Sequence, residues 1–210
     1  MYVPPRFQET DHETLYQFIR ANPFALLVTT GMSDETAVPA PLATHLPMEL
    51  QPDSGGKLQL FGHLARANPQ WKMLGTDAPA LVVFSGPHAY ISSSWYDHVN
   101  VPTWNYLAVH VAGRTRLLDE EETLSLLHQQ LGHYEANSRC PVSVASMTEA
   151  YVRKEMRGLV GFSMQIETIQ GAAKLSQNRD DKNHSAIVEE LKKQNDFNAN
   201  RVAEEMTRRR

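Results

Sequence analysis

Apolar residues recur at helical spacing in several stretches of the chain. Leu15, Phe18 and Ile19 follow residues 10–13, Thr-Asp-His-Glu, a pattern typical of a capping box, and the predicted helix ends near Asn22 because Pro23 follows. Asp119 and Glu122 indicate the start of another helix, with a stripe of leucines after it. Further helices are predicted over 66–74, 147–157 and 183–193, and the polar end 195–210 carries only Val202 and Met206 at helical spacing.

Short β-branched and apolar runs predict about six strands. The runs are 24–30, 36–46, 58–61, 80–84, 89–92, 103–118 and 159–169. Pro39, Pro41 and Pro47 would remove ladder donors, so the second run is predicted as an edge or interrupted strand. Within 80–92, the sequence Ser-Gly-Pro at 85–87 indicates a turn and therefore a hairpin.

The order of these elements constrains the fold class. Strands cluster in the first two-thirds of the chain and do not alternate cleanly with helices, which argues against a doubly wound parallel sheet. A mainly β (α+β) fold is predicted, an antiparallel barrel with peripheral helices.

Composition excludes several classes of protein. The 210 residues carry 20 Lys+Arg against 24 Asp+Glu, a net charge of −4, and 41% hydrophobic residues, which is the profile of a folded domain without a strongly basic nucleic-acid surface. A single cysteine, Cys140, excludes an internal disulfide framework. No apolar run is long enough to span a bilayer, and residues 1–6 lack a signal-peptide core, so a cytoplasmic protein is expected.

Familiar catalytic motifs are missing from the sequence. It contains no phosphate-binding P-loop, no dinucleotide-binding glycine motif and no Gly-x-Ser-x-Gly elbow. None of the nine histidines forms a His-x-x-x-His pair, and Cys140 has only Arg139 as a basic neighbour. We therefore expect no metal site and assign no catalytic residue.

Four segments are too polar and aromatic for ordinary core: 43–47, 62–71, 86–106 and 174–178. In the second, His63 and Arg66 near a helix start suit an anion, although taken alone a solvated arginine and a core-edge histidine explain them more simply. The third interleaves tryptophans and tyrosines with hydroxyls and amides, which suits a planar ligand, a packed aromatic cluster or an interface. In the fourth, Lys174 could reach a phosphate or a flavin edge, or the segment could simply cap the next helix.

Taken together, these segments resemble the PaiB family of FMN-binding negative transcriptional regulators over nearly the whole chain. The stretch 62–71, Gly-His-Leu-Ala-Arg-Ala-Asn-Pro-Gln-Trp, is the most specific. Further matching blocks are Asn-Pro-Phe-Ala at 22–25, Ala-Thr-His-Leu-Pro at 43–47, Val-Pro-Thr-Trp-Asn-Tyr at 101–106 and Lys-Leu-Ser-Gln-Asn-Arg at 174–179. The chain departs from the family pattern at Ser93, where proline is expected after Ser92.

The resemblance implies a split barrel of the pyridoxamine-phosphate-oxidase type, a homodimer with FMN at the subunit interface. It places Thr44, His45 and Leu46 along the flavin edge, and His63 and Arg66 at the phosphate. The remaining cofactor-binding residues that it implies are Trp104 and Asn105 near the ring, with Lys174, Ser176 and Gln177 closing the site. We expect residues 1–182 to form the FMN-binding domain and 183–210 a C-terminal helical segment, packed on it or partly mobile.

Three functions stay open from the sequence. The first is a flavin-binding repressor, for which direct DNA binding has no support from charge beyond the cluster of Arg201 and residues 208–210. The second is an FMN-dependent oxidoreductase acting on a small molecule, with His45, His63 and His110 as available proton donors. The third is haem binding through one of the histidines.

Overall fold

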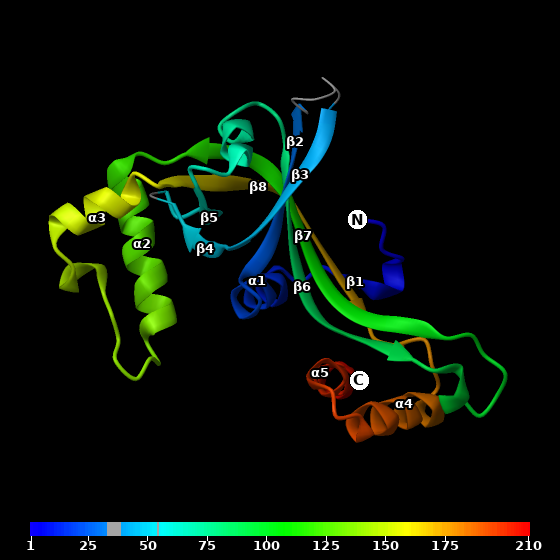
Figure 1. Ribbon diagram of the computed structural model, residues 1–210. Helices are drawn as coiled ribbons and strands as arrows, with labels where there is room; N and C mark the ends of the chain where they lie inside the picture. The colour runs from blue at the N-terminus through cyan, green and yellow to red at the C-terminus, as the bar shows by residue number, and fades with distance from the viewer. Residues whose placement is uncertain (33–38, 54) are drawn as a thin grey trace. The chain divides into compact units, whose positions relative to one another are not determined.

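The computed structural model describes residues 1–32, 39–53 and 55–210, and it combines one antiparallel sheet with five α-helices (Figure 1). The strands are β1 (Gln8–Glu9), β2 (Phe24–Met32), β3 (Pro39–Pro47), β4 (Glu49–Pro52), β5 (Leu58–Ala65), β6 (Ala80–Ile91), β7 (Thr103–Leu117) and β8 (Leu159–Lys174). The helices are α1 (His12–Ala21), α2 (Glu120–Glu135), α3 (Glu149–Met156), α4 (Asp181–Lys193) and α5 (Phe197–Arg208), with short 3-10 turns η1 (Pro5–Phe7), η2 (Pro69–Met73), η3 (Ser93–Trp95) and η4 (Val144–Ser146).

The sheet is open at two edge strands. Its hydrogen-bonded order is β3-β2-β6-β7-β8-β5-β4, with β1 paired to β8 off this path. The pairs β2–β3, β2–β6, β4–β5, β5–β8 and β1–β8 are antiparallel. The predicted mainly β, antiparallel fold with peripheral helices is therefore confirmed.

Strand β3 bears out the proline argument. It pairs with β2 from Phe24↔Pro47 to Met32↔Pro39 and ends the strand order, which is the edge position that its three prolines require. Residues 36–38, which were predicted to begin this strand, lie outside the described residues.

The chain folds as two compact units, each of which collects distant segments. Unit 1 comprises residues 1–22, 84–110 and 170–210, and unit 2 comprises residues 23–83 and 111–169. Strands β6, β7 and β8 each contribute residues to both units. The domain boundary expected after residue 182 stays a prediction.

Unit 1 has a core to which the C-terminal helices contribute. Ile187 and Leu191 of α4 and Val202 and Met206 of α5 are at most 1% exposed, and they pack with residues of β6, β7 and β8. The polar C-terminal end is thus an amphipathic helix: Val202 and Met206 face this core, together with Ala199 and Ala203, whereas Phe197 at the start of the helix is 75% exposed.

Unit 2 has its own core between its strands. Leu27, Leu60, Val82, Phe162 and Met164 are completely buried there. Close packing also explains one glycine of this unit, because a Cβ at Gly62 would lie 2.7 Å from Met48 Sδ.

Helix starts follow the sequence signals closely. Asp119 and Glu122 form a reciprocal capping box at α2, as predicted. In α1 the cap is Asp11, whose carboxylate accepts from the Thr14 N–H, and not the predicted Thr10. The helix predicted over 66–74 is the shorter 3-10 turn η2.

The hairpin predicted within 80–92 is wrong, because these residues form the single strand β6. Gly86 keeps an extended backbone, and a Cβ there would lie 2.7 Å from the Phe18 ring. Glycine here allows the close approach of an aromatic side chain rather than a reversal of the chain.

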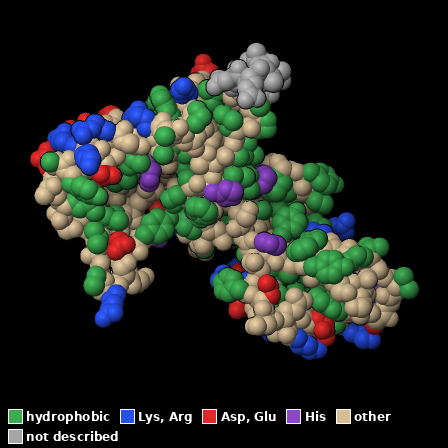
Figure 2. All heavy atoms as spheres, viewed as in Figure 1, with side chains coloured by type: hydrophobic (Ala, Val, Ile, Leu, Met, Phe, Trp, Pro, Cys, Tyr) green, Lys and Arg blue, Asp and Glu red, His purple; other side chains and the backbone are tan. Residues whose placement is uncertain are grey.

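In residues 1–32, 39–53 and 55–210, no helix is both long and apolar enough to cross a membrane, and no group of three or more His, Cys, Asp or Glu side chains could hold a metal ion. Figure 2 shows basic and acidic side chains intermixed over α3 and α2, where Arg153 bridges Glu149 and Glu120.

Candidate functional site

The ten residues predicted to bind a cofactor divide equally between the two units. Unit 2 holds Thr44, His45, Leu46, His63 and Arg66. Unit 1 holds the other five, namely Trp104, Asn105, Lys174, Ser176 and Gln177.

Thr44 belongs to a buried polar cluster around Gln70. The Gln70 amide N–H groups donate to Leu27 O, Thr29 Oγ1 and Leu42 O at 3.1–3.2 Å, and Gln70 Oε1 accepts from Thr44 Oγ1 at 2.5 Å. Asn68 Nδ2 donates to the same hydroxyl at 2.8 Å. The most specific motif of the sequence therefore fixes η2 against the β2–β3 hairpin, with Thr44 at the contact.

The two residues after Thr44 point in opposite directions, as alternate residues of a strand do. Leu46 is 4% exposed and belongs to the core. His45 is exposed and stacks on Phe24, with ring centroids 5.8 Å apart and an interplanar angle of 20°. Phe24 is itself 67% exposed, so this pair offers a flat aromatic surface at the sheet edge.

His63 is half-buried. Burial lowers its pKa, and a nearby hydrogen-bonding group, Gln130 of α2, opposes this shift only in part. The ring is therefore neutral at pH 7. Its Nδ1 atom is buried without a hydrogen-bond partner among the described residues.

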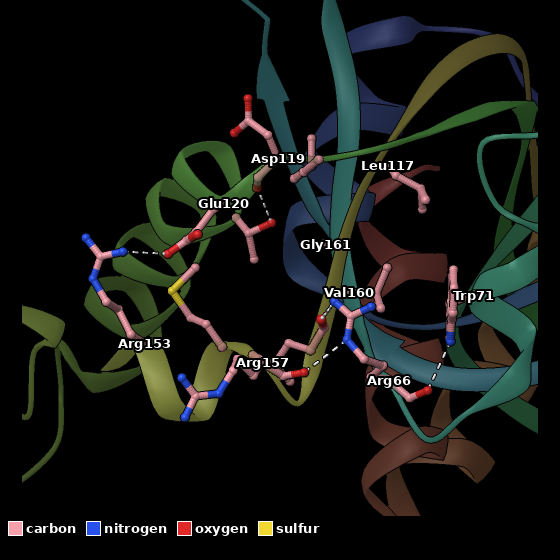
Figure 3. Close-up of a pocket in the computed structure, with 13 residues that line it drawn as sticks. Arg66, Trp71, Leu117, Asp119, Glu120, Arg153, Arg157, Val160 and Gly161 are labelled. Carbon is pink, nitrogen blue, oxygen red and sulfur yellow. Dashed lines mark hydrogen bonds and ion pairs between the residues drawn. The ribbon is translucent and has the colours of Figure 1, made fainter. Parts of the chain in front are cut away.

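Arg66 lines a pocket of about 450 Å³ between η2, the start of α2 and the turn from α3 into β8 (Figure 3). Its Nε donates to Arg157 O and its Nη2 to Leu159 O, both at 2.9 Å, so the side chain holds this turn. Trp71 returns a hydrogen bond to Arg66 O at 3.0 Å and lies beside the guanidinium.

The charges that line this pocket are mixed. Arg153 and Arg157 contribute positive charge, while Asp119 and Glu120 contribute negative charge. The helix start expected to attract an anion is also occupied, since η2 begins after Asn68 and the Asn68 side chain accepts from the Gln70 N–H. Anion binding by Arg66 and His63 stays a prediction.

In unit 1, Trp104 is the centre of an exposed aromatic cluster. Its ring lies 5.8 Å from the Tyr90 ring and 6.1 Å from the His88 ring, measured between centroids. Trp104 is 53% exposed and Tyr90 46%. Such a surface suits a planar ring or a partner protein.

Asn105 lies on the other face of β7, and Lys174 is the last residue of β8. Asn105 is fully buried and exchanges hydrogen bonds with Ser176 Oγ at 3.0–3.1 Å, while Lys174 Nζ donates to Thr103 Oγ1. Because side chains alternate along a strand, Thr103 and Asn105 stand opposite Trp104. The structure therefore brings together Asn105 and Ser176, and separates them from Trp104 by the strand.

Ser176 and Gln177 shape the chain beyond β8. Ser176 has φ of 60°, a left-handed conformation that costs energy for a residue with a side chain, and its hydrogen bonds to Asn105 stabilise it there. Gln177 accepts from the Leu175 N–H at 2.8 Å and donates to Ala173 O. These two residues thus have local partners inside unit 1.

Sequence analysis missed two residues with prominent roles, Gln70 and Arg179. Both lie inside the family blocks quoted above. The signal for Gln70 is its place directly after Pro69, at the start of a short helical turn that buries it. Arg179 follows the last strand and lies over the Tyr96 ring at 4.8 Å. Arg179 and Tyr96 are 83 positions apart in the sequence, so only the fold brings them together.

Comparisons with known proteins agree with the proposed resemblance. Residues 1–168 match the family described as "Putative FMN-binding domain". The chain is 39% identical over 206 residues to "Protease synthase and sporulation protein PAI 2" of Bacillus subtilis, covering 98% of this chain and 96% of that protein. An uncharacterized protein of Emericella nidulans is 31% identical over 214 residues, or 84% of each chain.

Solved structures with a similar fold include an FAD and haem binding protein and a flavocytochrome. The FAD and haem binding protein from Mycobacterium smegmatis has a TM-score of 0.61 and 16% identity, covering 85% of this chain and 78% of that chain. The flavocytochrome Anf3 from Azotobacter vinelandii has a TM-score of 0.56 and 16% identity, with 88% and 78% coverage. This likeness confirms the split-barrel fold type. The family match supports the expected cofactor, FMN. The chain belongs to the FMN-binding family that its first 168 residues match, the family of the sporulation protein PAI 2.

Proposed function

We propose that this chain is a cytoplasmic, homodimeric FMN-binding protein that acts as a negative transcriptional regulator of the PaiB type. The observation that carries the proposal is the near-full-length similarity to PAI 2, a protein named for protease synthesis and sporulation. Control of gene expression is the role most consistent with such a relative, and the sequence contains none of the common catalytic motifs named above.

The residues present fit a flavin. In unit 1, the exposed rings of Trp104 and Tyr90 can pack against an isoalloxazine. In unit 2, the exposed backbone of β3 can hydrogen-bond to a flavin edge, because β3 is an edge strand. We keep the ten predicted residues as the candidate cofactor contacts. FMN bound there would supply one- or two-electron redox chemistry, which makes a redox-sensing regulator reasonable.

An exposed apolar surface supports the homodimer. In unit 1, Val99 is fully exposed, Val101 is 70% exposed, and Trp104 and Tyr90 are about half exposed. Large apolar side chains that gather on a surface are typical of protein interfaces. A second copy of this chain is the partner that we propose.

Repression through a protein partner is favoured over direct DNA contact. The basic C-terminal cluster is neutralised, because Arg209 pairs with Glu205 and Glu9, and Arg208 pairs with Glu205. Arg201 and Arg210 also pair with carboxylates. Cations that already have partners gain little from a phosphate backbone.

An FMN-dependent oxidoreductase is the alternative. Burial lowers the pKa of both His63 and His110, so these rings are neutral at pH 7 and could accept a proton from a substrate. Haem binding is the third candidate, and the names of two similar structures, which bind haem or are flavocytochromes, favour testing it.

The visible spectrum of the purified protein, before and after FMN is added, separates these functions. We expect a flavin absorbance band that a reduced nicotinamide cofactor bleaches slowly or not at all. Rapid, catalytic oxidation of the nicotinamide would favour the oxidoreductase, and a Soret band would favour haem.

The regulatory role needs its own experiment. Deletion of the gene in the organism that encodes the protein should raise the transcription of target genes, and a wild-type copy should restore repression. Fluorescence anisotropy with promoter DNA at two salt concentrations should show only weak, salt-sensitive binding. Unchanged transcript levels in the deletion strain would contradict the regulator.

A further inference from the structure

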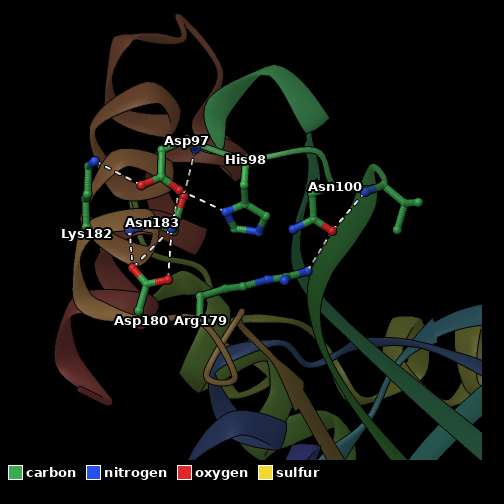
Figure 4. Close-up of polar contacts among 8 residues, drawn as sticks. Asp97, His98, Asn100, Arg179, Asp180, Lys182 and Asn183 are labelled. Atoms are coloured by element: carbon green, nitrogen blue, oxygen red, sulfur yellow. Dashed lines mark hydrogen bonds and ion pairs between the residues drawn. The ribbon is translucent and has the colours of Figure 1, made fainter.

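Arg179 is the centre of a group of hydrogen-bond donors in unit 1. Its side chain is half-buried, its Cζ lies 4.8 Å from the centroid of the Tyr96 ring, and its Nη2 lies 3.4 Å from Asn100 Oδ1. Figure 4 shows the Arg179 side chain extending from the start of α4 toward Asn100.

The orientation of the Asn100 amide follows from its neighbours. Its Oδ1 accepts from the Val101 N–H at 2.8 Å as well as from Arg179, so the other amide atom must be the nitrogen. Asn100 Nδ2 is buried and has no partner among the described residues. Tyr96 Oη is also buried without a partner among the described residues, and Tyr96 is only 9% exposed.

Lys174 adds a second cation close to Arg179. The side chain is half-buried, its Nζ donates to Thr103 Oγ1, and burial together with the charge of Arg179 lowers its pKa. Within the described parts of the chain, no carboxylate lies within 4.0 Å of either cation.

The nearby carboxylates are engaged elsewhere. Asp97 accepts from His98, Lys182 and Asn183 at 2.8–2.9 Å, and Asp180 accepts from Asn183 at 2.9–3.1 Å (Figure 4). Among the described residues, the two cations therefore have only neutral acceptors, Thr103 Oγ1 for Lys174 and Asn100 Oδ1 for Arg179, and the two buried donors have none. Buried donors without acceptors are costly and rare in native proteins, which indicates that an acceptor comes from outside the chain.

We infer that Arg179, Lys174, Asn100 and Tyr96 form an oxyanion site that binds the phosphate group of FMN. The inference rests on the proposed flavin binding and assigns its phosphate end. A guanidinium and an ammonium supply charge-assisted hydrogen bonds to phosphate oxygens, and the amide and hydroxyl supply neutral ones. Arg66 is the competing candidate, but two of its N–H donors already bind the carbonyls of Arg157 and Leu159.

Comparison of FMN with riboflavin, which lacks the phosphate, tests the inference on the full-length protein. Quenching of flavin fluorescence gives both dissociation constants. Wild type should bind FMN at least about tenfold more tightly than riboflavin, because riboflavin cannot accept the charge-assisted hydrogen bonds that the phosphate group would accept. Arg179→Gln should weaken FMN binding about tenfold and leave riboflavin binding unchanged, and Arg179→Lys should fall between the two.

Two further variants and a competition experiment separate the explanations. Arg66→Gln tests the competing phosphate site and should keep more of the preference for FMN than Arg179→Gln does, and the exposed Arg139→Gln, outside the candidate contacts, is the control and should keep all of it. Inorganic phosphate should compete with FMN but not with riboflavin in the wild-type protein. If Arg179→Gln does not fold, Lys174→Gln and phosphate competition give the answer instead.

Each contrary result has a distinct meaning. The site would be overturned if Arg179→Gln weakened the binding of FMN and of riboflavin equally. It would also be overturned if only Arg66→Gln lost the preference for FMN, and in both cases flavin binding itself would still stand. A wild-type protein that does not distinguish the two flavins would overturn it as well. Binding of neither flavin would contradict the proposed function itself.

Discussion

Single buried polar residues hold the key turns of this protein. Gln70 is 2% exposed and satisfies hydrogen-bonding groups on two strands and on Thr44, as described above. A short polar turn can therefore be fixed to the sheet without a large apolar contact. The position of Thr44, the first of the predicted flavin-edge residues, depends on this amide.

Replacing Gln70 with leucine should destabilise the protein by roughly 2–4 kcal/mol, because the variant leaves several buried acceptors unpaired. Urea unfolding followed by circular dichroism measures the change. The exposed neighbour Lys72, changed to alanine, should alter the free energy of unfolding by less than about 0.5 kcal/mol. Equal small effects of both substitutions would show that the amide cluster contributes little.

Asp97 predicts a pH dependence at the residue scale. Hydrogen bonds from His98, Lys182 and Asn183 hold the pKa of its carboxyl well below the usual range. A lowered pKa in the folded state stabilises the protein above the unfolded pKa of about 4, and this contribution is lost as the pH falls through the folded pKa.

Asp97→Asn should therefore be less stable than wild type at pH 7, and the difference should shrink as the pH falls below about 4. Thermal unfolding between pH 3 and pH 7 measures it, with the exposed Asp77→Asn as control. A difference that stays constant over this range would mean that the Asp97 charge is not involved.

Sequence reasoning predicted individual site residues better than their partners. It selected Lys174 and Asn105, but it could not show that Asn105 is completely buried or that Ser176 adopts a left-handed conformation. Arg179 and Tyr96 gain their significance only through a contact between the loop after η3 and the segment after β8. Such long-range contacts leave no periodic signal in the sequence.

At the scale of elements, capping residues and hydrophobic periodicity predicted helix starts and strands correctly, whereas glycine did not predict a turn correctly. The α2 capping box and the strand β7 were predicted correctly, because each depends on neighbours within a few residues. The dipeptide Gly86-Pro87 suggested a turn, yet it lies within β6, where Phe18 packs on the glycine. A glycine required by a distant side chain cannot be distinguished by sequence from one required by a turn.

Two glycines in unit 2 offer an opposite pair of predictions. A Cβ at Gly113 of β7 would lie 1.8 Å from the Gln165 carbonyl oxygen, whereas one at Gly132 of α2 would meet open space. Gly113→Ala should therefore destabilise the protein by about 3 kcal/mol or more, since backbone must move. Gly132→Ala should stabilise it by about 0.5–1 kcal/mol, because alanine favours the helix.

Chemical unfolding of both glycine variants tests this pair. The contrast of sign matters more than either value. A Gly113→Ala protein as stable as wild type would show that β7 and β8 do not approach as closely as described.

At the scale of the whole molecule, the sequence predicted the fold class and family but not the division into two units. The units join segments that lie far apart, such as residues 1–22 with 170–210, and the strands β6, β7 and β8 contribute to both. Local patterns cannot reveal this division, because the same strand periodicity continues through it.

The proposed homodimer gives a prediction at this scale. Trp104→Ser removes the largest exposed aromatic side chain of the unit 1 surface and should weaken association at least about tenfold, as interface tryptophans often do. Sedimentation velocity between 1 and 50 micromolar measures it, and the exposed Tyr151→Ser of α3 is the control. A monomeric wild-type protein over this range would contradict the homodimer.

The measurement that tests the central claim most directly is an equilibrium titration of FMN with the purified wild-type protein, followed by the quenching of flavin fluorescence. The account predicts saturable binding of one FMN per chain, with a dissociation constant in the micromolar range or below. An absence of quenching at tens of micromolar protein would contradict it.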